Sequence, residues 1–561
     1  MNETRDAWEQ VVGRLVRRRL VRAALVVLAL LYAGAIYAPL LASDRPYVLV
    51  GIDYREYGEA RRTLLPATTN LARLLREGPE EYGARRAASG GFGWEEAVAA
   101  EEEAAARRVA TMQAYLAGEP RAAVLGDLSA RVDAAVAAGR SGDRERATAH
   151  ADAARELAGA IQTSLAARDP RRPGEGEVTL RPVRRHPLWQ AIGATELFFM
   201  VLWTLVLLGP LWGRAVDRLL LGGDPTRIRR ARAAKLAAVL ALSLLGALAG
   251  GRGGGGSTSL ESASIKAGLT SGDIVATRVV FPPLSFGFAE LRAGERLRPP
   301  SWAGGAARAP AGAGAGPPEV EVLYGEPAAA SPWRHLLGTD SLGRDLLVRL
   351  LWGGRISLTV GLVSAVLLVL IGTAVGAAAG YFGGWIDLVL SRVIEVVLCI
   401  PAFFLILTVV AFTDPAVVPP LVAIAVVIAL VRWTGVARLA RAEVLRLREL
   451  EFTLAARALG ASALRTIFRH VLPNAIGPIL VAGAFAVAAG ILTESALSFL
   501  GLGVSHPIPS WGALATESRS PAHWWIQVFP GLLIFVTVVC YNLVGDAIRD
   551  AVDPRMRIES R

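Results

Sequence analysis

The sequence predicts a mostly helical protein that crosses a membrane about eight times. Just over half of its residues are hydrophobic (53%), and its mean hydropathy is +0.42. Several apolar runs approach the roughly 20 residues that a helix needs to cross a hydrocarbon core of about 30 Å. Arginines cluster between these runs, as the positive-inside rule predicts for cytoplasmic segments. The predicted fold class is therefore an all-α polytopic membrane protein, and the formal charge of +11 does not require a nucleic-acid partner.

The first predicted span follows a basic segment at residues 1–21. A signal peptide is the alternative, but the run Ala23–Ala42 exceeds the usual apolar length of about 7 to 15 residues. An uncleaved anchor with a cytoplasmic N-terminus is therefore favoured, and residues 1–50 form the first predicted unit. The later predicted spans are Ala191–Trp212, Leu236–Gly250, Ser357–Gly380, Val396–Phe412, Val417–Val431, Asn474–Leu492 and Trp524–Leu543.

Three further segments separate the first span from the last five. Residues 51–190 are polar and rich in Ala, Glu, Arg and Leu, which favours a helical extracytoplasmic insertion. The alternative is a set of partly disordered charged helices without a binding role. Residues 191–250 then predict an additional transmembrane hairpin, in which Leu236–Gly250 is short for a full span. Residues 251–335 form an extracytoplasmic linker region, where Val275–Phe288 is able to hold one or two short strands.

The residues that carry common enzyme chemistry do not form a motif. The only lysines are Lys235 and Lys266, and neither lies in a phosphate-binding loop, so any ATP that drives this protein binds to another polypeptide. Cys399 and Cys540 lie in apolar runs and indicate no disulfide framework. The sequence therefore predicts no catalytic residue, no metal site and no cofactor in this chain.

A compact polar segment, Glu451–Pro473, stands between two apolar runs. It predicts two short helices, with Gly460 at the turn between them and a helix stop at Pro473, because proline cannot continue a helix. The first helix carries Ala455 and Ala456, and the second carries Arg465 and Arg469. Arginines in the preceding segment place this loop on the cytoplasmic side.

The loop resembles the coupling loop of permease subunits of bacterial ABC importers, in the branch that transports dipeptides, oligopeptides and nickel. The resemblance rests on the spacing Ala455-Ala456-x3-Gly460 and on Leu472-Pro473. Leu454 and His470 depart from the broad family consensus, which has Glu and Ile at these positions. The segments Leu336–Leu358, Gly380–Pro401 and Thr493–Gly512 resemble the same branch, and Ala38–Val50 resembles its microcin C-like subgroup.

The resemblance implies a type I ABC importer permease fold for residues 336–561 and no enzymatic activity in this chain. It implies a second permease subunit, two cytoplasmic ATPase subunits that bind ATP and Mg²⁺, an extracytoplasmic substrate-binding protein, and a bacterial inner membrane with both termini in the cytoplasm. Peptides, nickel complexes and peptide-derived antibiotics all fit as substrates. The ATPase-coupling residues that it implies are Ala455, Ala456, Arg457, Gly460, Arg465, Arg469, His470, Leu472 and Pro473.

Two other features have both structural and functional interpretations. Gly372, Gly376 and Gly380 lie four residues apart, so they share one helix face that permits close approach of a neighbouring helix, and packing is the favoured role. Glu494 lies near the end of an apolar run, where it either lines the translocation path or is a hydrogen-bonded helix-end carboxylate. A membrane enzyme that uses Glu494, and a channel or secondary transporter, remain alternatives to an importer.

Overall fold

The structure is a computed structural model that describes residues 18–86, 93–166, 180–209, 212–213, 216, 225–250, 259–303, 321–324, 334–414, 418–504 and 507–552. In this part of the chain, five helices are long and apolar enough to cross a membrane, and a sixth span results if the bent pair α14–α15 is one span. The predicted helical membrane fold is confirmed. The membrane helices are α2 (Arg19–Ile36), α13 (Leu346–Phe382), α14 (Gly384–Cys399), α15 (Ala402–Phe412), α16 (Pro420–Arg448), α19 (Leu472–Phe499) and α21 (Trp525–Val552).

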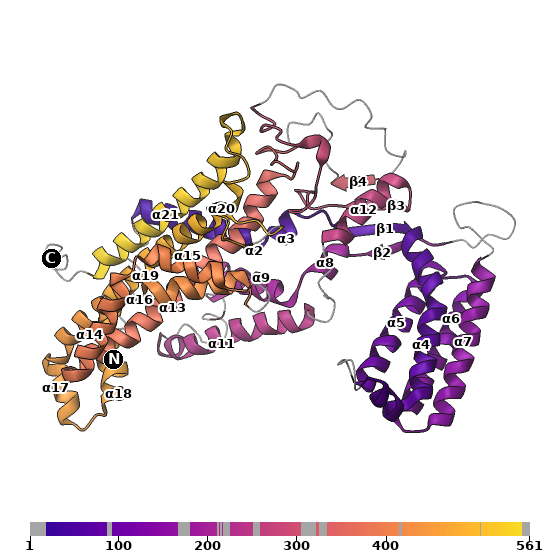
Figure 1. Ribbon diagram of the computed structural model, residues 1–561, viewed down its shortest axis with the longest axis horizontal. Coiled ribbons are helices and arrows are strands. Elements are labelled where there is room, and N and C mark those ends of the chain that lie inside the picture. Colours follow the sequence, from indigo (N-terminus) through magenta and orange to yellow (C-terminus); the bar gives the residue numbers. More distant parts are fainter. Residues whose placement is uncertain are drawn as a thin grey trace.

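These helices form one packed unit, in which α13 lies along both α16 and α19, and α21 packs against α19 and α2 (Figure 1). The helix α13 begins where Asp345 caps it, because the Asp345 carboxylate accepts a hydrogen bond from the Val348 amide at 2.9 Å. It therefore starts eleven residues before the predicted span Ser357–Gly380. The predicted span Val396–Phe412 is instead the end of α14 and all of α15, which are bent by 80° beside Pro401.

The two ends of this unit differ. At one end, the loop end, lie the short helices α17 (Glu451–Ala458) and α18 (Ala463–Thr466). Arg18 and Asp550 form an ion pair of 2.6 Å, which joins the start of α2 to the end of α21. Gly477, just after the loop, faces Val552. The start of the first span, the end of the last span and the loop therefore lie at the same end.

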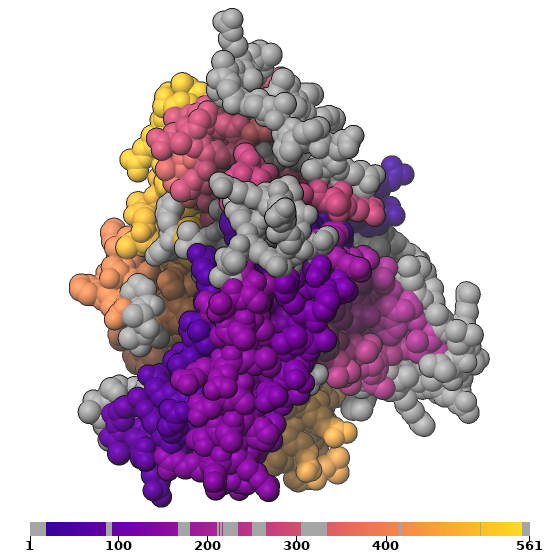
Figure 2. Space-filling model, turned by 90° about the vertical axis from the view of Figure 1, so that its right-hand side faces the viewer, coloured from indigo at the N-terminus to yellow at the C-terminus, as the bar shows by residue number. Residues whose placement is uncertain are grey.

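Four helices form a separate bundle in the region of the predicted insertion. Its core consists of buried aliphatic and aromatic side chains from all four helices, among them Leu64, Met112, Leu128 and Leu165. We call the opposite end of the membrane helices, near the strands, the sheet end. The bundle is joined to the strands there and lies to the right of the membrane helices in Figure 1, and it fills the front of the view in Figure 2. Its members are α4 (Tyr54–Arg86), α5 (Trp94–Tyr115), α6 (Pro120–Arg140) and α7 (Arg144–Ala166).

A small four-stranded sheet at the sheet end accompanies the helices. Its order is β2-β1-β3-β4, in which β1 runs antiparallel to β2 and β3, and β3 runs parallel to β4. One or two short strands were predicted within Val275–Phe288, and β3 overlaps this segment. The others are short and pair with strands far away in the sequence, so no local periodicity reveals them. The strands are β1 (Val48–Asp53), β2 (Val183–Arg185), β3 (Ile274–Val280) and β4 (Glu321–Tyr324).

The predicted extra hairpin is present as two packed apolar helices, α9 (Ala194–Leu207) and α11 (Pro225–Gly250). The 14 residues of α9 rise about 21 Å, which is less than a hydrocarbon core of about 30 Å. The apolar part of α11, Ala234–Leu248, is likewise shorter than a usual span. The number of spans therefore reaches the predicted eight only if the bent pair α14–α15 counts as a sixth span and these two short helices are added to it. Short helices α8 (Pro187–Ala191) and α12 (Ser259–Ser271) flank the hairpin.

Several predicted segments lie outside the described residues. These are the N-terminal basic residues 1–17, the glycine run Gly253–Gly256 and most of the linker Ala303–Pro318.

Candidate functional site

The loop between α16 and α19 folds as two short helices joined by a tight turn. Gly460 has a φ of +81°, in the left-handed region that glycine adopts without steric cost. No other atom lies within 4 Å of the position that a Gly460 Cβ would occupy. Glycine is therefore required here for the path of the backbone and not for packing. The Ser462 side chain then caps α18 by accepting a hydrogen bond from the Arg465 amide.

One face of the loop is fixed to the membrane helices. The fully buried Thr453 donates its hydroxyl hydrogen bond to the Leu447 carbonyl at the end of α16, at 2.8 Å. Ile467 and Val471 pack into an apolar cluster with Val444 from the same helix. Thr453 thus ties the first helix of the loop to α16, and the turn after the second helix packs on α16 and runs into α19. A force applied to the loop therefore reaches α16 and α19 directly.

The opposite face of the loop is apolar and exposed. Leu459 is 89% exposed, Leu464 65% and Phe468 68%. Exposed arginines, among them Arg457 and Arg465, lie close to these residues in the sequence. A cluster of exposed apolar side chains with a polar rim is typical of a protein–protein contact. We call Leu459, Leu464 and Phe468 the apolar loop face. Sequence reasoning did not include it, although apolar residues within a basic loop were a usable signal.

The structure divides the predicted coupling residues between the two faces. Ala455 is exposed, whereas Ala456 is buried against the membrane helices. His470 and Leu472 are partly buried. The other predicted coupling residues are exposed, namely Arg457, Gly460, Arg465, Arg469 and Pro473.

The predicted helix stop at Pro473 is wrong. The helix continues from α18 through a π-helical turn at Ile467–Val471 into α19, and Pro473 lies in the first turn of α19. A proline is tolerated there because the local change of hydrogen-bond register absorbs its missing amide donor.

The three spaced glycines face α16. A Cβ on Gly372 would lie 2.7 Å from the Trp433 carbonyl oxygen, and one on Gly380 would lie 2.8 Å from that of Arg441. For Gly376 the distance to the Ala437 carbonyl oxygen would be 2.3 Å. These glycines therefore allow α13 to contact the backbone of α16 along three turns.

Glu494 is fully buried among hydroxyl groups at the sheet end. Its carboxylate accepts hydrogen bonds from Ser357 at 2.8 Å and Ser498 at 2.7 Å. Ser357 also accepts a hydrogen bond from the Trp511 amide at 3.2 Å. The carboxylate thus joins α13, α19 and α20 (Trp511–Leu514). Within this chain its surroundings match those of a hydrogen-bonded structural carboxylate.

We predict that Glu494→Gln retains transport. The amide oxygen of glutamine still accepts one serine hydrogen bond and its nitrogen donates to the other, so the contact between helices persists. Glu494→Ala should lower the melting temperature, because it leaves buried hydroxyl groups without that partner. Measured uptake and melting curves of both variants check this. A loss of uptake in Glu494→Gln, in a protein of unchanged melting temperature, would instead support a role in the translocation path.

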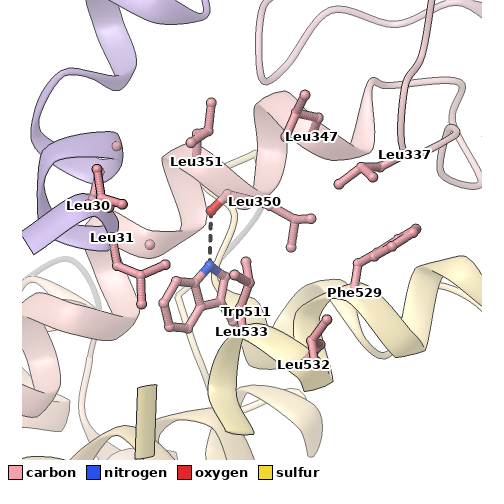
Figure 3. Close-up of a pocket in the computed structure, with 13 residues that line it drawn as sticks. Leu30, Leu31, Leu337, Leu347, Leu350, Leu351, Trp511, Phe529, Leu532 and Leu533 are labelled. Carbon is pink, nitrogen blue, oxygen red and sulfur yellow. Dashed lines mark hydrogen bonds between the residues drawn. The ribbon is translucent and has the colours of Figure 1, made fainter. Parts of the chain in front are cut away.

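An apolar cavity of about 180 Å³ lies beside this cluster, where α2, α13, α20 and α21 meet (Figure 3). The Trp511 indole projects into it and donates a hydrogen bond to the Leu350 carbonyl at 2.9 Å. Leucine side chains from α2, α13 and α21 form the other walls. The cavity therefore offers no polar side chain that would orient a substrate.

A buried network of charged side chains joins the linker region to the core at the sheet end. His335 bridges the carboxylates of Glu295 and Asp345, with both contacts at 2.9 Å. Burial by itself would lower the pKa of His335, but the hydrogen bonds to Asp345 and Glu295 outweigh it and raise this pKa above its ordinary value. Although burial opposes it, hydrogen bonds from His335 and Arg334 lower the pKa of Glu295 to about 2. Within the described residues, no group of three or more His, Cys, Asp or Glu side chains is placed to hold a metal ion.

This network predicts that stability falls in alkaline solution. The raised pKa of His335 means that its stabilising charge is fully present below pH 6.5 and is lost as the pH rises through the folded-state pKa. Glu295 contributes above pH 4.5 and loses its contribution as the pH falls towards about 2. The melting temperature of purified protein should therefore decrease by a few degrees between about pH 6 and 9. His335→Gln should remove this slope, and parallel curves for the two proteins would contradict the assignment.

Comparison with known proteins places these features in a family. Residues 372–558 match the family model described as "Binding-protein-dependent transport system inner membrane component", and residues 5–65 match that of the "N-terminal TM domain of oligopeptide transport permease C". The dipeptide transport system permease protein DppC of Alkalihalophilus pseudofirmus is 40% identical over 225 residues, which are 40% of this chain and 73% of that protein. The oligopeptide transport system permease protein OppC of Haemophilus influenzae is 41% identical over 226 residues, which are 40% of this chain and 71% of that protein.

Among solved structures, the chain is similar to the inward-facing MetNI methionine ABC transporter. The alignment has a TM-score of 0.30 and 20% identity, and it covers 37% of this chain and 98% of that chain. The bundle α4–α7 and the hairpin α9–α11 lie almost entirely between the two segments that match family models.

Proposed function

The chain belongs to the binding-protein-dependent permease family of ABC importers, and on this premise we propose that it imports peptides by means of the loop between α16 and α19. As a member of this family it is a transport subunit of the inner membrane and not an enzyme. One observation carries the proposal. The loop exposes its apolar loop face on one side, and on its other side it is fixed to two membrane helices.

We propose that the apolar loop face binds a separate ATPase subunit. Leu459 and Phe468 supply apolar contacts, and the arginines around them supply orientation by charge. ATP and Mg²⁺ would bind to that partner. If the loop contacts the open and the closed ATPase differently, closure of the ATPase shifts the equilibrium between two orientations of the membrane helices. Alternating access of the substrate path is the result of this shift.

The sidedness of the chain supports this arrangement. The start of α2, the end of α21 and the loop share one end, and the exposed Arg438 and Arg446 and the half-buried Arg448 lie near it. By the positive-inside rule, we propose that this is the cytoplasmic end and that both termini are cytoplasmic. The bundle α4–α7 then lies on the outer side, where a substrate-binding protein would deliver the substrate.

We further propose a second permease subunit. The bent pair α14–α15 exposes large apolar side chains, among them Trp385 at 74% and Phe412 at 87%. A homologous permease that packs on this surface would complete the translocation path. The branch of the family supports peptides as the substrate class, since the similar proteins are named for dipeptides and oligopeptides.

Co-purification with a matched pair of glycine variants tests the proposal. Gly460 and Gly501 both have a positive φ, of +81° and +83°, and both have open space at the Cβ position. Tryptophan therefore strains the backbone to a similar degree at either site. Gly460→Trp should lose the ATPase partner, whereas Gly501→Trp at the sheet end should retain it. A channel, a secondary transporter or a membrane enzyme would bring down no ATPase with either variant.

A further inference from the structure

A half-open cavity of about 320 Å³ lies where the first span, the inserted hairpin and the start of α13 meet. Its walls come from the segment after α2, from α8 and the start of α9, from the loop after β3, and from Trp352 of α13. This volume is at the lower end of the range of about 300–1,000 Å³ that is usual for ligand sites. The cavity walls from residues 188–196, 287–289 and 352 lie outside both segments that match family models.

One half of the cavity is a rigid apolar wall. The rings of Phe288 and Trp352 pack with their centroids 4.6 Å apart and their planes tilted by 36°, and the Trp352 indole donates a hydrogen bond to the Ala42 carbonyl at 2.9 Å. Leu188 and Ile192 are almost fully buried and extend this wall towards the hairpin. The aromatic pair is therefore fixed in place before any ligand arrives.

The other half carries charges of both signs. The carboxylates of Asp44 and Glu196 and the guanidinium of Arg45 line it, and Arg45 is only 9% exposed. Glu196 is held in position by Arg355 at 2.8 Å and by the Gly193 amide at 3.1 Å. Two carboxylates and one guanidinium in the wall suit a ligand that carries an ammonium group together with an anionic group.

The surroundings of the cavity indicate a lipid. Glu196 lies in the first turn of α9, and farther along this helix the apolar side chains Phe199, Val206 and Leu207 are about half exposed. An apolar helix that exposes such side chains in a membrane protein faces hydrocarbon. A molecule with its head group in the cavity is therefore able to lay its acyl chains along α9.

We propose that this cavity binds the head group of a zwitterionic phospholipid that carries a primary amine, of the phosphatidylethanolamine class. Its ammonium group lies towards Asp44 and Glu196, its phosphate lies towards Arg45, and its acyl chains follow α9. Because Arg355 pairs with Glu196, the carboxylates and guanidinium groups at the cavity balance in charge. A zwitterionic head group keeps this balance, whereas an anionic head group without an amine would add an uncompensated negative charge. The bound lipid fastens the inserted hairpin to the first span and to α13.

Native mass spectrometry of the full chain with its co-expressed partner subunits tests this proposal. The complex is exchanged into detergent with phosphatidylethanolamine, with phosphatidylglycerol or with water-soluble phosphoethanolamine. Wild-type protein should retain one phosphatidylethanolamine per chain and about tenfold less phosphatidylglycerol, a ratio that corresponds to about 1.4 kcal/mol. Equal retention of both lipids, or binding of phosphoethanolamine as strong as that of the lipid, would overturn the proposal.

Three variants locate the site. Ala191→Trp fills the cavity and should abolish retention of the lipid, whereas Leu370→Trp, on an exposed part of α13 away from the cavity, should not. Asp44→Asn conserves volume and should reduce the preference for the amine lipid, so this variant tests the site if Ala191→Trp does not fold. Unchanged lipid binding in Asp44→Asn, or equal losses in Ala191→Trp and Leu370→Trp, would place the lipid elsewhere.

Discussion

Leu459→Asp should reduce ATP-dependent uptake to background while the protein remains folded. The Leu459 side chain is 89% exposed, so the substitution removes no internal packing. It places a charge at the centre of the apolar loop face, where binding of the ATPase would bury it without a partner. Loss of such an anchor residue costs about 2 kcal/mol or more of binding free energy, which is roughly thirtyfold in affinity.

Uptake of labelled peptide into cells or vesicles, together with the ATPase activity of the purified complex, measures this effect. Leu291→Asp is the matched control, because Leu291 is 66% exposed but lies in the linker region at the sheet end. It should leave both activities unchanged. Equal activities of the two variants would show that the apolar loop face does not bind the ATPase.

Gly376→Leu should prevent accumulation of folded protein. A Cβ at Gly376 would lie 2.3 Å from the Ala437 carbonyl oxygen and 2.8 Å from the Ala440 Cβ, and the first of these is backbone that cannot move alone. Leucine adds three further carbon atoms, so α13 and α16 must separate along the contact that the three glycines form. The cost should exceed the roughly 1–3 kcal/mol that is usual for overpacked cores.

Gly531→Leu is the control for this prediction. Gly531 lies within α21, and no atom lies within 4 Å of its Cβ position. Both substitutions gain the same intrinsic helix propensity, about 1 kcal/mol, so any difference between them reports packing. Size-exclusion profiles and melting curves in detergent should show loss of the folded peak only for Gly376→Leu. A wild-type profile for that variant would mean that α13 and α16 are farther apart than described here.

The sequence was most informative where structure is local. The apolar runs predicted the membrane helices, and the spacing of Gly372, Gly376 and Gly380 predicted a shared helix face, because both depend on helical periodicity. The sheet was not predicted, since β1 pairs with strands more than 120 residues away and each strand is only 3 to 7 residues long.

Buried polar contacts between distant segments were likewise missed. Asp340 and Arg344 precede α13 and are buried in a network that includes Arg349 and Glu517. Arg344 contacts Glu517 at 2.9 Å across 173 positions of the sequence. No pattern in one sequence pairs such residues. The helix that continues through Pro473 was missed for a different reason, because a π-helical turn has no distinct sequence signature.

Photo-cross-linking from position 459 tests the central claim most directly. A photoreactive amino acid in place of Leu459, activated in intact membranes, contacts whatever covers the apolar loop face. If the apolar loop face binds the ATPase, we expect one main covalent product, formed with a cytoplasmic subunit that hydrolyses ATP. Products with lipid alone, or with proteins of the outer compartment, would contradict it.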